Sequence, residues 1–350
     1  MRVPRLRTLA LLGSLDAVFT IVSQHPALGH EKWFVKDPGM FKTDWSFAFR
    51  PWTLAALAIA AVLTVVWRFA AVQVLPTPEL KPLRFLGRLA PYMPRLLGIH
   101  LGISLLAAAV GGHFLTHDLE MSGVTGGNAL LMLEGALGVW FITGVRLRPA
   151  ALALVVLGPF ALLVTGPVDL LSAADLLGVA GFLAILPPSD APLGAVALTE
   201  RQLTRALFVL RAGVGTALLT LAFAEKLANP ALAKQTFLLY PKLDVFRLIG
   251  VHVSPSTFIT IAGGTEVLFG LLVLSGAMPQ LAVLVAGIPF NATLILFGAT
   301  EMLGHLPVYG VFLTLLVYGS NPVTAPWVRW FPRGWATADI PAHAQASASW

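Results

Sequence analysis

Acidic, basic and aromatic polar side chains that could hold a proton or a polar ligand occur within apolar stretches of this chain. Glu301 and His305 are four residues apart, which places both on one face of a helix, and Tyr309 follows one turn later. A carboxylate, an imidazole and a phenol on one face can bind a polar ligand or transfer protons. With groups near the ends of neighbouring segments they form a predicted outward-facing polar pocket, made of Glu225, Lys226, Glu266, Glu301, His305 and Tyr309.

A weaker counterpart of this pocket is predicted in the first half of the chain, from His113, Glu134, Asp169 and Asp175. A charge at the centre of a bilayer costs about 2.5 to 3.5 kcal/mol, so such residues mark either a site or a helix end. Two interpretations remain open. The groups form a ligand or proton site, or they form structural ion pairs between helices, such as Lys226 with Glu266 or Glu301.

The residue types exclude several kinds of chemistry. The chain has no cysteine, which excludes disulfides, thiolate metal sites, iron–sulfur ligation and a thiol redox relay. His100, His113 and His117 are not helical neighbours, so no metal site is predicted from them. Phosphate-loop, dinucleotide and nucleophile-elbow motifs are also missing from the sequence. Any redox chemistry would therefore need a borrowed cofactor or a partner.

The composition is that of an integral membrane protein. Of 350 residues, 57% are hydrophobic and only 11% are charged, with a mean hydropathy of +0.81. A soluble domain carries about 25% charged residues, so this chain could not cover a globular surface. The net charge of +6 comes from basic residues scattered between apolar segments, which is typical of helix orientation in a bilayer. The expected surroundings are lipid, and no nucleic-acid partner is predicted.

The apolar segments predict an all-α protein with about ten transmembrane helices, since about 17 to 25 apolar residues cross a bilayer. The segments are residues 8–23, 53–75, 96–116, 128–145, 149–166, 170–187, 205–228, 256–277, 279–298 and 303–320. The first segment, preceded by Arg2, Arg5 and Arg7, is also typical of a signal peptide ending near residue 29. Cleavage there would leave nine spans.

The basic residues also predict an orientation. With the N-terminus inside, fifteen Lys and Arg residues fall on the inner side and eight on the outer side. The positive-inside rule then places both termini in the cytoplasm, in the plasma membrane or bacterial inner membrane. A long outer loop at 24–50 offers a contact surface for a soluble partner, made of His30, Lys32, Trp33 and Phe34. The second long outer loop, 229–255, is expected to lie in the membrane interface.

An internal repeat predicts the domain organisation. Glu134, Gly138 and Gly144 match residues 132 positions later, and Asp169 matches Glu301 at the same offset. Each unit has four helices, an even number, so the two tandem repeats would be parallel. The predicted divisions are an N-terminal anchor or signal with an extra span at 1–94, repeat one at 95–190, repeat two at 200–320, and an interfacial and disordered cytoplasmic tail at 321–350.

The second unit resembles the DoxX-like family of four-helix membrane proteins. The matching residues are Arg211 and Gly215, Glu225-Lys226-Leu227, Glu266 to Gly270, and Glu301 with the GHLPVYG segment at 304–310. In the first unit Gly112-His113 replaces the Glu-Lys pair, and SAADLLG replaces GHLPVYG. Since DoxX-like proteins include thiosulfate:quinone oxidoreductase subunits, the resemblance implies a subunit of a membrane redox system. The implied ligand is quinone, and the implied partner is a soluble or membrane redox protein.

Two other functions remain open. The chain could be a non-catalytic scaffold, assembly or cargo-binding subunit that docks a soluble partner on its outer loops. It could also be a proton-coupled solute carrier, because parallel repeats and buried carboxylates occur in carriers. A carrier would need discontinuous helices in both units, and in the sequence only Pro159 and Pro289 indicate a break. The sequence assigns no catalytic residue and leaves open whether the protein is an enzyme.

Overall fold

The computed structural model is helical nearly throughout the residues that it describes, which are 35, 40–116, 119–121, 123–186, 198–248, 250–329 and 339–340. The long helices are α3 (Pro51–Gln73), α4 (Met93–Val110), α5 (Gly127–Thr143), α6 (Leu147–Thr165), α8 (Ala174–Ile185), α9 (Glu200–Leu221), α12 (Pro255–Ser275), α13 (Pro279–Phe297) and α15 (Leu306–Ser320). Shorter helices are η2 (Lys81–Tyr92), α7 (Pro167–Ser172), η3 (Ala222–Leu227), α10 (Pro230–Leu239), η4 (Pro241–Leu243), α11 (Val245–Leu248), α14 (Ala299–Gly304) and α16 (Ala325–Val328). Two-residue strands β1 (Leu198–Thr199) and β2 (Asp339–Ile340) pair in antiparallel fashion.

The prediction of an α-helical membrane protein is confirmed. Among the described residues, four helical stretches are long and apolar enough to cross a membrane, and they are Pro51–Gln73, Lys81–Val110, Glu200–Leu227 and Pro255–Ser275. Five shorter apolar helices accompany them. The number of spans and their orientation stay predictions, and the segment 8–23 lies outside the described residues.

Two of the predicted spans are interrupted in the structure. The segment 170–187 is divided at Ala173 between α7 and α8, and the segment 303–320 is divided at His305 between α14 and α15. Pro307 explains the second break, because proline cannot donate a backbone hydrogen bond and its ring clashes with the preceding turn. No proline or glycine adjoins Ala173, and nothing in the local sequence explains that break.

Local sequence signals place several helix ends. Thr199 and Gln202 form a capping box at the start of α9, and Ser254 caps α12 with Pro255 in its first turn. Helices α5 and α12 end at Gly144 and Gly276, whose φ angles of 74° and 65° lie in the left-handed region that glycine adopts without strain. These signals fix where the chain can turn back across the bundle.

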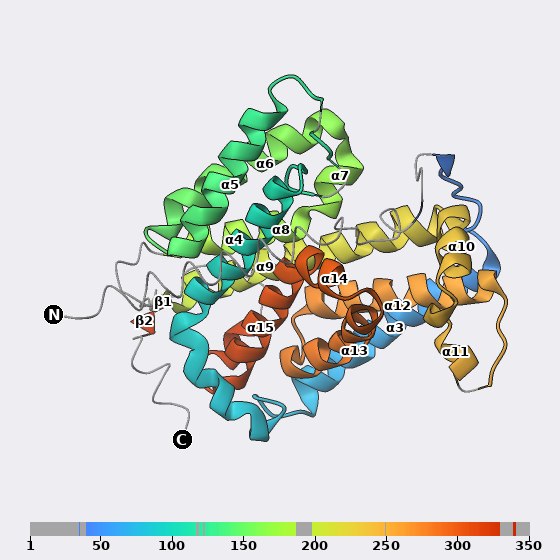
Figure 1. Cartoon of the computed structure of the whole chain (residues 1–350). Helices are drawn as coiled ribbons and strands as arrows, with labels where there is room; N and C mark the ends of the chain where they lie inside the picture. The colour runs from blue at the N-terminus through green and yellow to red at the C-terminus, as the bar shows by residue number, and fades with distance from the viewer. Residues whose placement is uncertain are drawn as a thin grey trace.

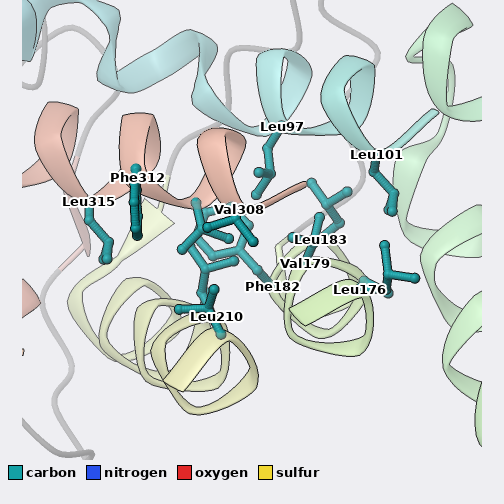
Figure 2. Close-up of a cluster of buried hydrophobic side chains, with 14 of the residues drawn as sticks. Leu97, Leu101, Leu176, Val179, Phe182, Leu183, Leu210, Val308, Phe312 and Leu315 are labelled. Carbon is teal, nitrogen blue, oxygen red and sulfur yellow. The ribbon is translucent and has the colours of Figure 1, made fainter. Parts of the chain in front are cut away.

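One apolar core joins the two halves of the chain. The helices α4 to α8 gather on one side of the molecule, α3, α12 and α13 lie on the other, and α9 and α15 run between them (Figure 1). Helix α8 packs on α9, and α15 packs on α4. Figure 2 shows side chains from α4, α8, α9 and α15 meeting at this junction, among them Leu97, Phe182, Leu210 and Phe312.

Pairs of glycines allow close helix contact on both sides of the molecule. A Cβ atom added at Gly102 of α4 would lie 2.5 Å from the carbonyl oxygen of Gly138 in α5. On the other side, a Cβ atom at Gly215 of α9 would lie 3.1 Å from the carbonyl oxygen of Gly270 in α12. Small residues at such crossings are the usual means of helix association in lipid.

A buried amide ties the loop after α3 to the rest of the bundle. The Gln280 side chain is fully buried, and its Oε1 accepts a hydrogen bond of 2.7 Å from the Leu80 amide. Its Nε2 donates to the Leu80 carbonyl at 3.3 Å and to the Ser320 hydroxyl at 2.8 Å. Glu79 completes the connection, because its Oε1 accepts a 2.8 Å bond from the backbone amide of Gln280 at the start of α13.

We predict that Gly102→Ala destabilises the protein, while Gly135→Ala in α5 does not. The added methyl group at Gly102 would overlap the Gly138 carbonyl, whereas at Gly135 the nearest atom is 3.7 Å away. Overpacking of this kind costs about 1 to 3 kcal/mol. The measurement is thermal unfolding in detergent, followed by tryptophan fluorescence. Equal unfolding temperatures for the two variants would contradict the close contact of α4 with α5.

The Glu79 carboxyl predicts a pH dependence of stability. Burial raises its pKa above the ordinary value of 4.5, while the Gln280 amide and Arg329 act in the opposite direction. The protonated form therefore stabilises the fold below pH 4.5, and this contribution is lost as the pH rises through the folded-state pKa. Glu79→Gln mimics the protonated form, so its stability relative to the wild type should increase across that pH range. Unfolding temperatures measured at several pH values test this, and a constant or decreasing difference would contradict it.

Candidate functional site

A cavity of about 70 Å³ lies where the two broken helices face each other. Its walls come from α4, α9, the α7–α8 break and the α14–α15 break, so both halves of the chain contribute. Most lining residues are apolar, including Ala108, Leu218 and Val308. The polar lining residues are Ser104, Thr116, Ser172, Asp175 and His305. The volume is enough for water, which needs at least about 10 to 15 Å³.

Asp175 and His305 each lie at one of the two breaks. Asp175 is the second residue of α8, and His305 is the residue before the first turn of α15. Both line the cavity. A carboxyl group and an imidazole in one apolar enclosure can exchange a proton with each other or with a bound ligand.

The ring of Phe290 in α13 supports His305. The two rings meet edge to face with centroids 5.1 Å apart. Tyr309 is also held here, because its hydroxyl donates a 3.1 Å hydrogen bond to the Phe290 carbonyl. Tyr309 therefore lies near His305, as its sequence spacing predicts, but it does not line the cavity.

Lys226 and Glu266 form an ion pair of 2.8 Å, which is one of the pairings that the sequence predicts. Glu225 and Lys226 belong to η3, a π-helical turn, and Glu225 is buried. Wide turns of this kind are rare and recur at functional sites. The second carboxylate oxygen of Glu266 has no hydrogen-bond partner among the described residues.

The predicted six-residue pocket is divided in the structure. His305 lines the cavity together with Asp175 from the predicted counterpart set, while Glu225, Lys226 and Glu266 do not line it. The side chain of Glu301 lies outside the described residues, as do the predicted contact residues His30, Lys32, Trp33 and Phe34. Asp175 and His305 come from different halves of the chain, so this cavity combines residues from the two predicted pockets.

The other three members of the counterpart set do not line the cavity. Glu134 is fully buried, and its Oε1 accepts a 2.9 Å hydrogen bond from the Leu115 amide. Its Oε2 has no hydrogen-bond partner among the described residues. His113 forms a backbone bridge with Glu120, and Asp169 lies in the first turn of α7. Glu134 thus anchors the loop after α4, where Leu115 has a φ of 60°.

Sequence reasoning assigned no structural role to arginines that lie against helix C-termini, such as Arg95 and Arg211. Arg95 donates a 3.2 Å hydrogen bond to the Phe141 carbonyl near the end of α5 and packs against Gly144. The Arg211 guanidinium lies against Gly276 at the end of α12 and is fully buried. A cation at a helix C-terminus is favoured by the helix dipole. For Arg95 the available signal was an arginine in the first turn of α4 and a glycine at the end of α5, whereas Arg211 lies in the middle of α9.

The described residues contain no group of three or more His, Asp or Glu side chains that could hold a metal ion. The side chains of Asp175 and His305 can bind protons or a polar ligand. Comparisons with known proteins found no matching family model, no matching curated protein and no matching solved structure.

The Glu134 contact predicts a difference between two substitutions. Glu134→Gln keeps an acceptor for the Leu115 amide, whereas Glu134→Leu leaves this buried amide without its partner. An unsatisfied buried donor costs about 1 to 3 kcal/mol, so only the leucine variant should unfold at a clearly lower temperature. Thermal unfolding in detergent measures both. If the glutamine variant lost as much stability as the leucine variant, the prediction would be contradicted. The charge of Glu134 would then contribute more to stability than its hydrogen bond.

Proposed function

We propose that this chain is a DoxX-like, multi-pass subunit of a membrane redox system that interacts with quinone at the cavity of Asp175 and His305. The observation that carries the proposal is that a carboxyl group and an imidazole, from the two halves of the chain, line one mostly apolar cavity. Ionisable groups inside membrane bundles usually mark ligand or proton pathways.

The chemistry of quinone fits these two side chains. Reduction of a quinone to a quinol adds two electrons and two protons, one proton to each carbonyl oxygen. His305 can donate a hydrogen bond to a carbonyl oxygen, and Asp175 can exchange a proton with the imidazole. The chain has no cysteine, so the electrons would come from a redox partner. Its own residues would orient the ring and deliver protons.

The size of the cavity limits how quinone would enter. A space of about 70 Å³ accepts water or the carbonyl edge of a ring, but not a whole quinone headgroup. We therefore propose that binding widens the cavity at the two breaks, where the short helices α7 and α14 are separated from α8 and α15. Such breaks are tolerated in a membrane where the backbone lines a cavity.

A second candidate function, a proton-coupled solute carrier, is favoured by the same two breaks. Many carriers bind their substrate between discontinuous helices contributed by two repeats. Here the breaks at Ala173 and His305 are 132 positions apart, the offset that relates Glu134 to Glu266. The matching contacts of Gly102 with Gly138 and of Gly215 with Gly270 support the proposed repeat. Nothing in the described residues favours the scaffold function, which stays a prediction.

We expect His305→Gln and Asp175→Asn to weaken quinone binding to the purified protein by about tenfold or more, the equivalent of about 1.4 kcal/mol. Glu266→Gln is the matched control, because it removes a carboxylate outside the cavity. Binding of a short-chain quinone is measured by quenching of tryptophan fluorescence.

Two results would contradict the redox proposal. One is a wild-type protein that binds no quinone, and the other is equal binding by the wild type and the His305→Gln variant. If the same protein in proteoliposomes moved protons together with a solute, and Asp175→Asn abolished this movement, the carrier function would replace the redox function.

A further inference from the structure

A second, larger cleft lies at the C-terminal end of α3, away from the cavity of Asp175 and His305. It has a volume of about 250 Å³, and its lining residues are Arg68, Ala71, Val72, Thr77, Ala277, Pro326 and Arg329. They come from the end of α3, the loop after it, the turn between α12 and α13, and α16. The cleft therefore lies where several helices end, at the level of a membrane boundary.

Two guanidinium groups are held rigidly in the walls of this cleft. Arg68 Nη1 donates a 2.7 Å hydrogen bond to the Ser275 carbonyl at the end of α12. Arg329 donates to the carbonyls of Ala71 and Pro76 at 2.8 and 2.9 Å. The Nε atom of Arg329 is buried and has no hydrogen-bond partner among the described residues. The Nη2 atom of Arg329 also lies 3.9 Å from the Glu79 carboxylate. These contacts hold two positive charges beside the cleft, where they can attract a phosphate group.

The surface beside the cleft is apolar and faces outward. Of the four long apolar helices in the described part of the chain, α3 is the least buried, because only 11% of its most apolar 18 residues are buried inside the protein. Val72 lines the cleft and is 54% exposed, and Phe69 and Val74 next to it are 63% and 70% exposed. In a membrane this surface contacts acyl chains. A ligand in the cleft would therefore have its polar end against arginine and its apolar part along α3.

We propose that this cleft binds the phosphate headgroup of an anionic phospholipid. Basic pockets between membrane helices are known to bind such headgroups. The Thr77 hydroxyl offers a further hydrogen bond to a phosphate oxygen, and the α3 surface accommodates the acyl chains. The inference depends on the membrane location of α3 and is independent of the proposed redox function.

The test compares lipids and a substitution that fills the cleft. The delipidated full-length protein in detergent is titrated with phosphatidylglycerol or phosphatidylcholine, and bound lipid is counted by native mass spectrometry. We expect the wild type to prefer phosphatidylglycerol by about tenfold or more. Val72→Phe should remove this preference by filling the cleft while both arginines stay in place. Val65→Phe is the matched control, because Val65 is 69% exposed on α3 and does not line the cleft.

Arg329→Gln is a second variant and should also lower the preference, by removing one of the two guanidinium groups. Equal binding of the two lipids by the wild type would overturn the proposal, as would the same preference in the Val72→Phe and Val65→Phe variants. Inorganic phosphate is titrated as a separate arm. If phosphate alone displaced the bound lipid at millimolar concentration, the site would be one for free phosphate, and the lipid assignment would be wrong.

Discussion

The structure depends on one constraint, which is that a bilayer offers no water to solvate a backbone group or a charge. Polar groups within the bundle must therefore find partners inside the protein. Arg68 and Arg95 bind carbonyl groups near helix C-termini, and Gln280 bonds at once to a loop and to another helix. Glu134 fixes the loop after α4 through a single backbone amide. These contacts connect segments far apart in the sequence, so the same groups that would be costly in lipid hold the bundle together.

The same constraint gives the two helix breaks their importance. A helix that stops in the middle of a bundle leaves backbone groups without intrahelical partners, and membranes tolerate this where the backbone is buried in protein or lines a cavity. At both Ala173 and His305 the chain lines one shared cavity, which also holds the side chain of Asp175. The core of α4, α8, α9 and α15 surrounds this junction.

The apolar segments could be predicted from sequence because burial in lipid requires long apolar runs, and α3, α9 and α12 begin within a few residues of the predicted limits. The Lys226–Glu266 pair was also among the predicted contacts. The breaks were missed because an apolar run does not reveal a single nonhelical residue, although Pro307 was an available signal. The placement of Asp175 and His305 in one cavity could not be predicted. These helices are apolar on most faces, so the sequence does not show which face turns toward which neighbour.

The central claim is that the cavity of Asp175 and His305 is a ligand site shared by the two halves of the chain. Because the chain has no cysteine, Ser104→Cys places a single thiol in the cavity wall, and Ser46→Cys places one on an exposed segment. The most direct measurement is the alkylation rate of each thiol with and without a short-chain quinone. The account predicts that quinone slows alkylation at position 104 by about tenfold or more and leaves position 46 unchanged. Equal rates at position 104 with and without quinone would contradict it.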